Sequence, residues 1–348
     1  MKRTLWKVLG AAVALALPLA FTACGAGTPK VENPETVSVG IFTEVDSANL
    51  LKEEGWFDQD LAKSNVKVKW VNFQAGRDIN NAFAAKSIDL AVGIGDPPVT
   101  IGVSSKIDYQ VFWIMSIAGD SEALVVRDKL KITSVKGLKG KKIATTVSST
   151  SHYSLLSALQ LEGLTANDVQ IVDLNPPDIL AAWQRKDIDA AYTWDPNLSV
   201  IAGSGGKILL SSKDLAAKGF PTTNYGVVST DFAQKYPHLV KAFIEGLIKA
   251  NDQITNEPDK AAEVWAKELS IDKAEALKQA KGQVWLSPAD QLGPTALGKT
   301  GAIGDTAKNL KKIGDFLVDQ KSLSAKEELA TYEKVVNPKY LEDAVATK

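Results

Sequence analysis

The pattern of apolar and polar residues in the first part of the chain predicts strands that alternate with helices. Residues 36–42, TVSVGIF, alternate as a buried strand does, and residues 47–63 follow with helical spacing. Strands expected at 66–73 and 89–95, with a helix at 78–88 between them, continue the succession. This rhythm is typical of a mostly parallel α/β sheet.

The same pattern starts again near residue 122. The phrases AAKSIDLAVG (84–93) and QRKDIDAAYT (184–193) occupy similar places in the two sets, so we expect two α/β units in tandem. From about Asp231 onward, apolar residues recur at helical spacing and predict a largely helical remainder. The second unit is expected to have strands at 122–128, 142–146, 168–175 and 189–196 and helices at 151–164 and 177–188.

The N-terminal segment has the pattern of an export signal. A basic start, MKRTLWK, precedes the apolar run VLGAAVALALPLAF, and small residues then surround Cys24. The phrase FTAC resembles a bacterial lipobox, which predicts a signal peptide at 1–23 and a lipid on Cys24. Residues 24–36 are then the lipidated N-terminus and a flexible tether, rich in Gly, Pro and polar residues. Cys24 is the only cysteine of the chain, so no disulfide within the chain is possible.

Length and charge exclude several function classes. The chain has 348 residues, which is enough for two domains with their own cores. It has 40 basic and 41 acidic residues, so it lacks the basic surplus that indicates a nucleic-acid partner. Beyond the signal segment, no apolar run is long enough to span a bilayer.

A cluster of hydroxyl residues around His152, in VSSTSHYSLL (147–156), raises the question of catalysis. A Ser/His nucleophile needs a base within reach and a third group that orients it, and the chain has no GxSxG turn. Two histidines and one cysteine do not make a typical zinc site, and neither a P-loop nor an EF-hand loop is present. We expect a protein that is not an enzyme and uses no cofactor.

The same cluster suits the binding of an anion. A strand at 142–146 that runs through hydroxyls into a helix leaves backbone N–H groups free at the positive end of the helix dipole. Sulfate, phosphate or carboxylate binds at such ends. The alternative is that one serine caps the helix and the others are solvated, and the residues alone leave both readings open.

Four stretches resemble the substrate-binding proteins of nitrate-, sulfonate- and taurine-type ABC importers, and most closely the taurine branch. They are GDSEALVVRD (119–128), STSHYSLLSALQLEG (149–163), VQIVDLNPPDILAAWQRKDIDAAYTWDP (169–196) and FPTTNYGVVSTDFAQKYPHLVKAF (220–243). The resemblance implies a two-lobed α/β periplasmic-binding-protein fold of type II, with the ligand in a cleft that closes by a hinge motion. Residues 37–126 with 230–348 are expected to form lobe 1, and 127–229 lobe 2.

The resemblance also implies a function and a site. The function is capture of taurine by a monomer and its delivery to a membrane permease with its ATPase, while Cys24 anchors the protein outside the cell membrane. The implied roles are Ser149, Thr150 and Ser151 at the sulfonate, His152 and Tyr153 in the adjoining wall, Glu122 at the ammonium group, and Trp194 over the ethylene stem with a cation–π contact.

Three positions depart from the taurine branch. Asn224 in PTTNYG replaces an acid that the branch places at the ammonium group, and two acids occur elsewhere, Asp96 in GIGDPP and Asp195 in TWDP. Both follow strands, where open α/β sheets place their ligands, although Asp195 also suits a turn before Pro196. We therefore add Asp96, Asp195 and Asn224 to the candidate site. Another aliphatic sulfonate or a small cationic or guanidino compound remains the alternative ligand.

Overall fold

The computed structural model describes residues 32–346. The predicted signal peptide, Cys24 and most of the predicted tether lie outside these residues. Within residues 32–346, none of the helices combines the length and the apolar character that crossing a bilayer requires.

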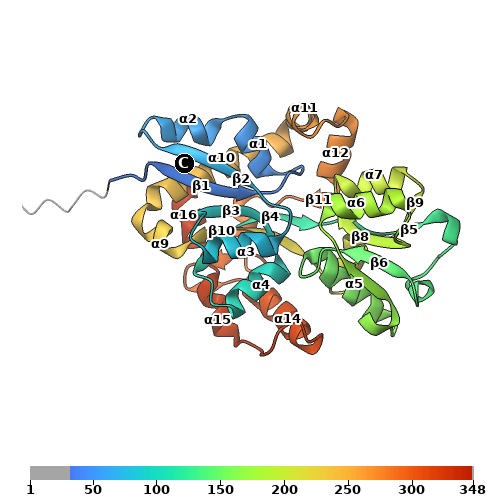
Figure 1. Cartoon of the computed structure of the whole chain (residues 1–348). Helices are drawn as coiled ribbons and strands as arrows, with labels where there is room; N and C mark the ends of the chain where they lie inside the picture. The colour runs from blue at the N-terminus through green and yellow to red at the C-terminus, as the bar shows by residue number, and fades with distance from the viewer. Residues whose placement is uncertain (1–31, 347–348) are drawn as a thin grey trace, which may run out of the picture. The chain divides into compact units, whose positions relative to one another are not determined.

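A mixed sheet organises the first lobe (Figure 1). In the described part of the chain it has six strands in the order β11-β4-β10-β3-β1-β2. They are β1 (Thr36–Ile41), β2 (Lys67–Asn72), β3 (Leu90–Gly95), β4 (Tyr109–Ala118), β10 (Thr223–Ser229) and β11 (Gln283–Val284). β1 is parallel to β2 and β3, whereas β10 is antiparallel to β3 and β4. The carboxyl ends of β1 and β3 therefore meet at one edge of the sheet.

A second sheet organises the second lobe, with five described strands in the order β7-β6-β8-β5-β9. They are β5 (Glu122–Arg127), β6 (Lys142–Thr145), β7 (Gln170–Asp173), β8 (Ala190–Trp194) and β9 (Gly206–Ser211). β6 is parallel to β7 and β8, and β5 is antiparallel to β8 and β9. A short hairpin, β12 (Gly298–Lys299) and β13 (Ala302–Ile303), lies apart from both sheets.

The strands next to the expected lobe boundaries belong to the opposite lobes. β5 lies in the second sheet, where Glu122 pairs with Trp194, although residues up to 126 were expected in lobe 1. β10 lies in the first sheet, where Asn224 pairs with Ser116, although residues up to 229 were expected in lobe 2. Each of these strands enters its sheet directly after the chain crosses from the other sheet, and each runs antiparallel there. The expectation of mostly parallel sheets is thereby corrected to mixed ones.

Helices cover both faces of the first sheet (Figure 1). One face carries α1 (Ser47–Glu53), α2 (Trp56–Ala62) and α10 (Pro237–Asn256), and the other carries α3 (Gly76–Ala84), α4 (Asp96–Ser104) and α14 (Asp305–Asp319). The prediction of a largely helical remainder is confirmed. Besides α10 and α14, it contains α9 (Thr230–Lys235), α11 (Pro258–Leu269), α12 (Lys273–Lys281), α13 (Pro288–Gln291), α15 (Leu329–Val335) and α16 (Lys339–Val345).

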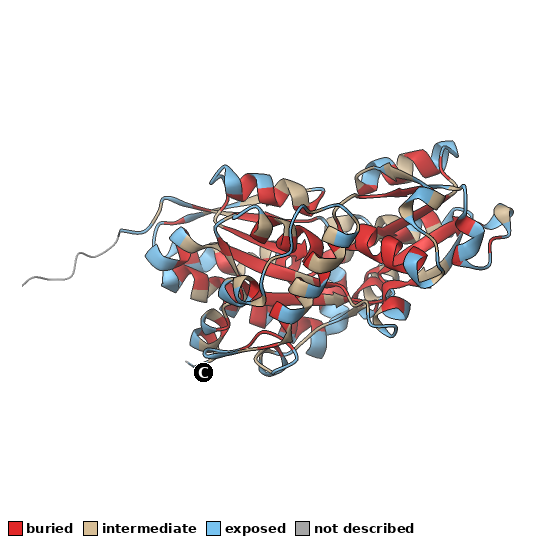
Figure 2. Cartoon of the chain, turned by 90° about the horizontal axis from the view of Figure 1, so that it is seen from below, coloured by how far each residue is buried: buried red, intermediate tan, exposed pale blue. Residues whose placement is uncertain are grey.

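The second sheet is covered in the same way because its strands are apolar on both sides. α5 (Thr150–Leu161) packs Leu155 and Leu159 near Leu124 of β5. α6 (Pro176–Arg185) and α7 (Asn197–Gly203) pack on the opposite face, where Trp183 meets Val125. Consecutive residues of a strand point to opposite faces, so β5 supplies both cores. Figure 2 shows the resulting buried interior of each sheet; the short α8 (Ser212–Ala216) completes the lobe.

Candidate functional site

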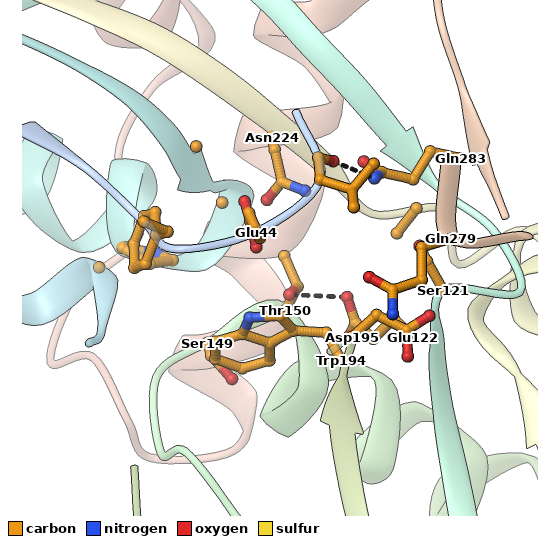
Figure 3. Close-up of a pocket in the computed structure, with 17 residues that line it drawn as sticks. Glu44, Ser121, Glu122, Ser149, Thr150, Trp194, Asp195, Asn224, Gln279 and Gln283 are labelled. Atoms are coloured by element: carbon orange, nitrogen blue, oxygen red, sulfur yellow. Dashed lines mark hydrogen bonds between the residues drawn. The ribbon is translucent and has the colours of Figure 1, made fainter. Parts of the chain in front are cut away.

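The two lobes enclose a cavity at the ends of their strands (Figure 3). Its empty space is about 630 Å³, counted with the solvent at its mouth. The first lobe contributes the ends of β1 and β3, and the second lobe contributes the beginning of α5 and the end of β8. The lining residues are Phe42, Glu44, Val45, Gly76, Gly93, Gly95, Pro98, Ala118, Ser121, Glu122, Ser149, Thr150, Trp194, Asp195, Asn224, Gln279 and Gln283.

Every charged side chain that lines this cavity is acidic. Glu44, Glu122 and Asp195 face it, and no lysine, arginine or histidine belongs to the lining formed by the described residues. The three carboxylates come from different elements: the loop after β1, the first residue of β5 and the loop after β8. An acidic cavity of this kind favours a ligand that carries a positive charge.

Glu122 is the most deeply buried of the three, with 3% of its surface exposed. Its Oε2 accepts a hydrogen bond of 2.9 Å from the Thr150 hydroxyl, whereas its Oε1 has no partner among the described residues. Burial raises the pKa of Glu122 to about 7, and the Thr150 hydroxyl opposes this shift. A cation that reached Oε1 would restore the interactions that this carboxylate lost on leaving water.

Two of the three hydroxyl groups at the beginning of α5 already have acceptors within the protein, whereas the buried Ser151 hydroxyl has no partner among the described residues. The Ser149 hydroxyl donates to the Thr146 carbonyl at 2.6 Å and accepts from His152 N, which makes Ser149 the cap of the helix. The Thr150 hydroxyl donates to Glu122. By contrast, the backbone N–H groups of Thr150 and Ser151 have no acceptor among the described residues. The donors left for an anion are therefore these N–H groups rather than the hydroxyls of Ser149 and Thr150, and the Ser151 side chain does not line the cavity.

Four of the predicted site residues do not line the cavity. Asp96 is 1% exposed, and its Oδ2 accepts from Thr223 N at 2.8 Å, which joins the beginning of α4 to β10. The Ser151 side chain, in the first turn of α5, is fully buried. His152 Nδ1 accepts from Ser148 N at 3.3 Å, and burial lowers the pKa of His152 to about 4. These three side chains are therefore buried within the protein and do not face the ligand cavity.

Tyr153 is the fourth residue outside the cavity. Its ring packs edge-on against Phe316 of α14, with ring centroids 4.9 Å apart, and Ile313 and Leu317 belong to the same cluster. Because Tyr153 lies on α5 and the other three on α14, this cluster joins the two lobes outside the ligand cavity. The phrase STSHYSLL thus supplies a lobe contact as well as a cavity wall.

The remaining predicted residues do line the cavity. Trp194 and Asp195 lie at the end of β8, and Asn224 lies on β10 across from them (Figure 3). Asp195 also has the structural role expected of a turn residue, because its Oδ1 accepts from Ser199 N at 2.9 Å. Burial raises the pKa of Asp195 to about 6.

Sequence analysis did not identify several of the lining residues as candidates for the site. Glu44 follows β1, and Gln279 and Gln283 lie on α12 and β11, far along the chain. Glu44 had a usable signal, because it follows a strand whose carboxyl end points to the cleft. Gln279 and Gln283 had none, since only the folded chain returns them to the cavity. The buried Gln279 Oε1 has no partner among the described residues and adds another acceptor.

An ion pair links the lobes near the cavity. Arg77 of α3 contacts both carboxylate oxygens of Asp173 in the second lobe at 2.9 Å, and it donates to the Asn175 side chain and the Val147 carbonyl. The lobes are thus held together on the α3 side by a guanidinium that reaches from one to the other.

Comparison with known proteins agrees with this architecture. The model of the NMT1-like family matches residues 30–269. The chain belongs to the NMT1-like family. One relative is the taurine-binding periplasmic protein of Escherichia coli (strain K12). It is 35% identical over 288 residues, which are 80% of this chain and 87% of the relative.

Solved structures show the fold of this NMT1-like protein. The periplasmic aliphatic sulphonate binding protein SsuA from Escherichia coli has a TM-score of 0.70 at 21% identity, covering 86% of this chain and 92% of its own. The desulfurization enzyme DSZB has a TM-score of 0.63 at 15% identity, covering 90% and 99%. The predicted two-lobed fold is confirmed, and the same fold also occurs in an enzyme.

Within the described residues, no group of three or more His, Cys, Asp or Glu side chains could hold a metal ion. Glu44, Glu122 and Asp195 face the cavity without forming a cation cage of that kind.

Proposed function

We propose that this protein is the solute-binding component of an ABC importer and that it captures taurine or a closely related aminosulfonate without altering it. The observation that carries the proposal is that one cavity offers a negatively charged acceptor at one place and free hydrogen-bond donors at another. Glu122 offers an unpartnered carboxylate oxygen, and the first turn of α5 offers free N–H groups. A zwitterion with an ammonium group and a sulfonate satisfies both. The 35% identity to the taurine-binding protein supports the same ligand.

The all-acidic lining favours a second candidate, a small guanidino or diamino compound. Asp195 brings a third carboxylate to the cavity, whereas taurine has a single ammonium group. A planar guanidinium pairs with carboxylates through several N–H donors and stacks on an aromatic ring such as Trp194. This candidate requires no anion subsite at α5.

Isothermal titration with four probes tests these assignments. Taurine and ethanesulfonate differ by one amino group, and methylguanidinium and methylurea have nearly the same shape but differ in charge. We expect taurine to bind at least tenfold more tightly than ethanesulfonate, because an alkanesulfonate leaves Glu122 buried without a partner. If methylguanidinium binds tenfold more tightly than taurine, the second candidate replaces the first. Binding of none of the four would contradict both.

We also propose that the protein is exported and carries a lipid on Cys24, with the lobes closing around the ligand before they meet the permease. The Escherichia coli relative is a periplasmic protein, and the basic, apolar and small-residue segments before Cys24 support export. The proposed domains are a signal peptide, a tether and two lobes. Strand β10 belongs to the first lobe and strand β5 to the second.

Replacing the lipid-bearing residue should release the protein from the membrane. The variant Cys24→Ala is expected to move from the membrane fraction to the soluble exported fraction, because one chain-terminal anchor is lost. Fractionation after a salt wash, with metabolic labelling by a fatty acid, measures this. Ser38→Ala in β1, far from the processing site, serves as a control. A Cys24→Ala protein that stays in the membrane fraction would contradict the lipid anchor.

A further inference from the structure

The carboxylate of Glu44 has no role in the assignments above. It lies in the loop between β1 and α1 and lines the cavity. Its surroundings among the described residues contribute burial and repulsion but no hydrogen bond, and none is drawn to it in Figure 3. A carboxylate that faces a cavity without a partner still has hydrogen-bond acceptors available for a ligand.

The neighbouring strand holds Glu44 in this place. Gly93 of β3 has a φ of +97°, and a Cβ there would lie 2.7 Å from the Phe42 ring and 3.4 Å from Glu44 Oε1. The absence of a side chain at Gly93 therefore lets Phe42 and Glu44 lie directly against the end of β3. Glu44 and Asn224 face the cavity from this side, with Thr150 on the opposite side (Figure 3).

Other acceptors face the same space. Glu122 Oε1 and Gln279 Oε1 are buried and have no partner among the described residues. Burial raises the pKa of the Glu44 carboxyl well above its usual range, and repulsion from Asp46, Glu122 and Asp195 raises it further. The acids therefore act on one another through the same cavity.

We propose that Glu44 and Glu122 together form the subsite for the positively charged group of the ligand, and that Glu44 makes this subsite select a charged group over a neutral one. An ammonium or guanidinium group has enough N–H donors to serve two carboxylates at once. Asn224, which is neutral, leaves Glu44 as the acid on its side of the cavity. The inference rests on the proposed function in one respect, namely that the ligand occupies this cavity.

Binding should also release a proton. Burial favours the protonated form of both Glu44 and Glu122, and repulsion from Glu122 adds to this effect at Glu44, so a cation that pairs with the two carboxylates displaces a proton. Other charged groups surround this pair. Asp46 and Asp195 repel the Glu44 carboxylate and favour retention of its proton. Lys52 and Lys278 lower the pKa of Asp46 and of Asp195, respectively. Titrations at pH 7 in two buffers of different ionisation enthalpy measure the number of protons released.

Glu44→Gln tests the proposal because the amide keeps the shape of the side chain and removes its charge. Titration with taurine, methylguanidinium, ethanesulfonate and methylurea compares ligands that carry a positively charged nitrogen group with ligands that lack one. We expect Glu44→Gln to weaken the two amine-bearing cations or zwitterions by about 10- to 100-fold. The affinity for the neutral methylurea should change by less than about threefold, within the range of neutral hydrogen-bond exchange. The affinity for the anionic ethanesulfonate should not fall, because the substitution removes a like charge from the cavity. Glu245→Gln, on α10 and outside the cavity lining, is the matched control.

The outcomes separate this inference from the proposed function. If the wild type binds taurine or methylguanidinium and Glu44→Gln binds all four probes as the wild type does, Glu44 is not part of the subsite. Equal weakening of charged and neutral probes would also overturn the proposal, because it indicates a structural effect. If the wild type binds none of the probes, the proposed function fails. A double-mutant cycle of Glu44→Gln and Glu122→Gln on the melting temperature at pH 8 then decides whether the two carboxylates interact, and additive effects would overturn the pair.

Discussion

Glu122→Gln is expected to lower the affinity for the bound solute by about 3 kcal/mol, which is roughly a 100-fold loss. The reason is that Glu122 is buried with one carboxylate oxygen unpartnered, so its charge is compensated only when a cation arrives. The amide oxygen of glutamine can still accept the Thr150 hydroxyl, which keeps the local packing. Isothermal titration of wild type and variant with taurine and methylguanidinium measures the change.

The same substitution should stabilise the empty protein at neutral and alkaline pH. A carboxyl whose pKa is raised by burial destabilises the fold once it ionises, and glutamine cannot ionise. Lower affinity combined with a higher melting temperature distinguishes a lost ligand contact from a damaged fold. Glu245→Gln should alter neither quantity. An affinity within twofold of the wild type would contradict the role of Glu122.

Sequence patterns located most strands, but they did not show to which of the two sheets each strand belongs. The runs at 36–42, 66–73 and 89–95 correspond to β1, β2 and β3. β10 was not predicted as a strand, because TNYGVVS contains a glycine and polar ends and lies after an irregular stretch. Its place between β3 and β4 depends on long-range pairing, which local periodicity does not contain. The lobe boundary therefore differs from the expectation at both crossings.

The candidate site was predictable where a residue follows a strand and faces the cleft. Trp194, Asp195 and Asn224 line the cavity as expected, and Glu44 obeys the same rule although it was overlooked. The hydroxyls of α5 show what a sequence leaves open, because it does not reveal which acceptor a hydroxyl chooses. Ser149 and Thr150 donate within the protein, to the Thr146 carbonyl and to Glu122.

Asp96 is the opposite case, a residue that the sequence suggested for the site and that does not line the cavity. Its position after β3 matched the rule for ligand residues, yet its carboxylate accepts from Thr223 N. An acid at the first position of a helix is also favourable for the helix dipole, so the same residue had an ordinary structural explanation. Position at a strand end identifies candidates for a ligand site, and side-chain direction decides among them.

Acidification is expected to stabilise the empty protein, which is the reverse of ordinary acid denaturation. Burial raises the pKa of several carboxyls above their usual range, among them Glu44, Asp96 to about 8, Asp46 and Glu122 to about 7, and Asp195 to about 6. Between the usual carboxyl pKa and these values, the folded state binds more protons than the unfolded state. The free energy of unfolding therefore falls as the pH rises through this window.

The expected size is large because each group contributes up to about 1.4 kcal/mol per pH unit across its own window. The melting temperature of the empty protein should therefore be several degrees higher at pH 5 than at pH 8. His152, whose pKa burial lowers to about 4, opposes this trend below its usual pKa, so the gain should level off in more acidic solution. Differential scanning calorimetry across pH 4.5–8.5 measures the profile.

Asp96→Asn separates this effect from ligand chemistry, because Asp96 does not line the cavity. The amide oxygen of asparagine can still accept from Thr223 N, so the variant should keep its fold and lose part of the pH dependence up to about pH 8. The exposed Asp60→Asn, in α2, is the matched control and should follow the wild-type profile. A saturating cationic ligand should flatten the wild-type profile as well, because it compensates Glu122 in its ionised form. A melting temperature that is constant or rises between pH 5 and pH 8 would show that these carboxyls are not desolvated in the empty protein.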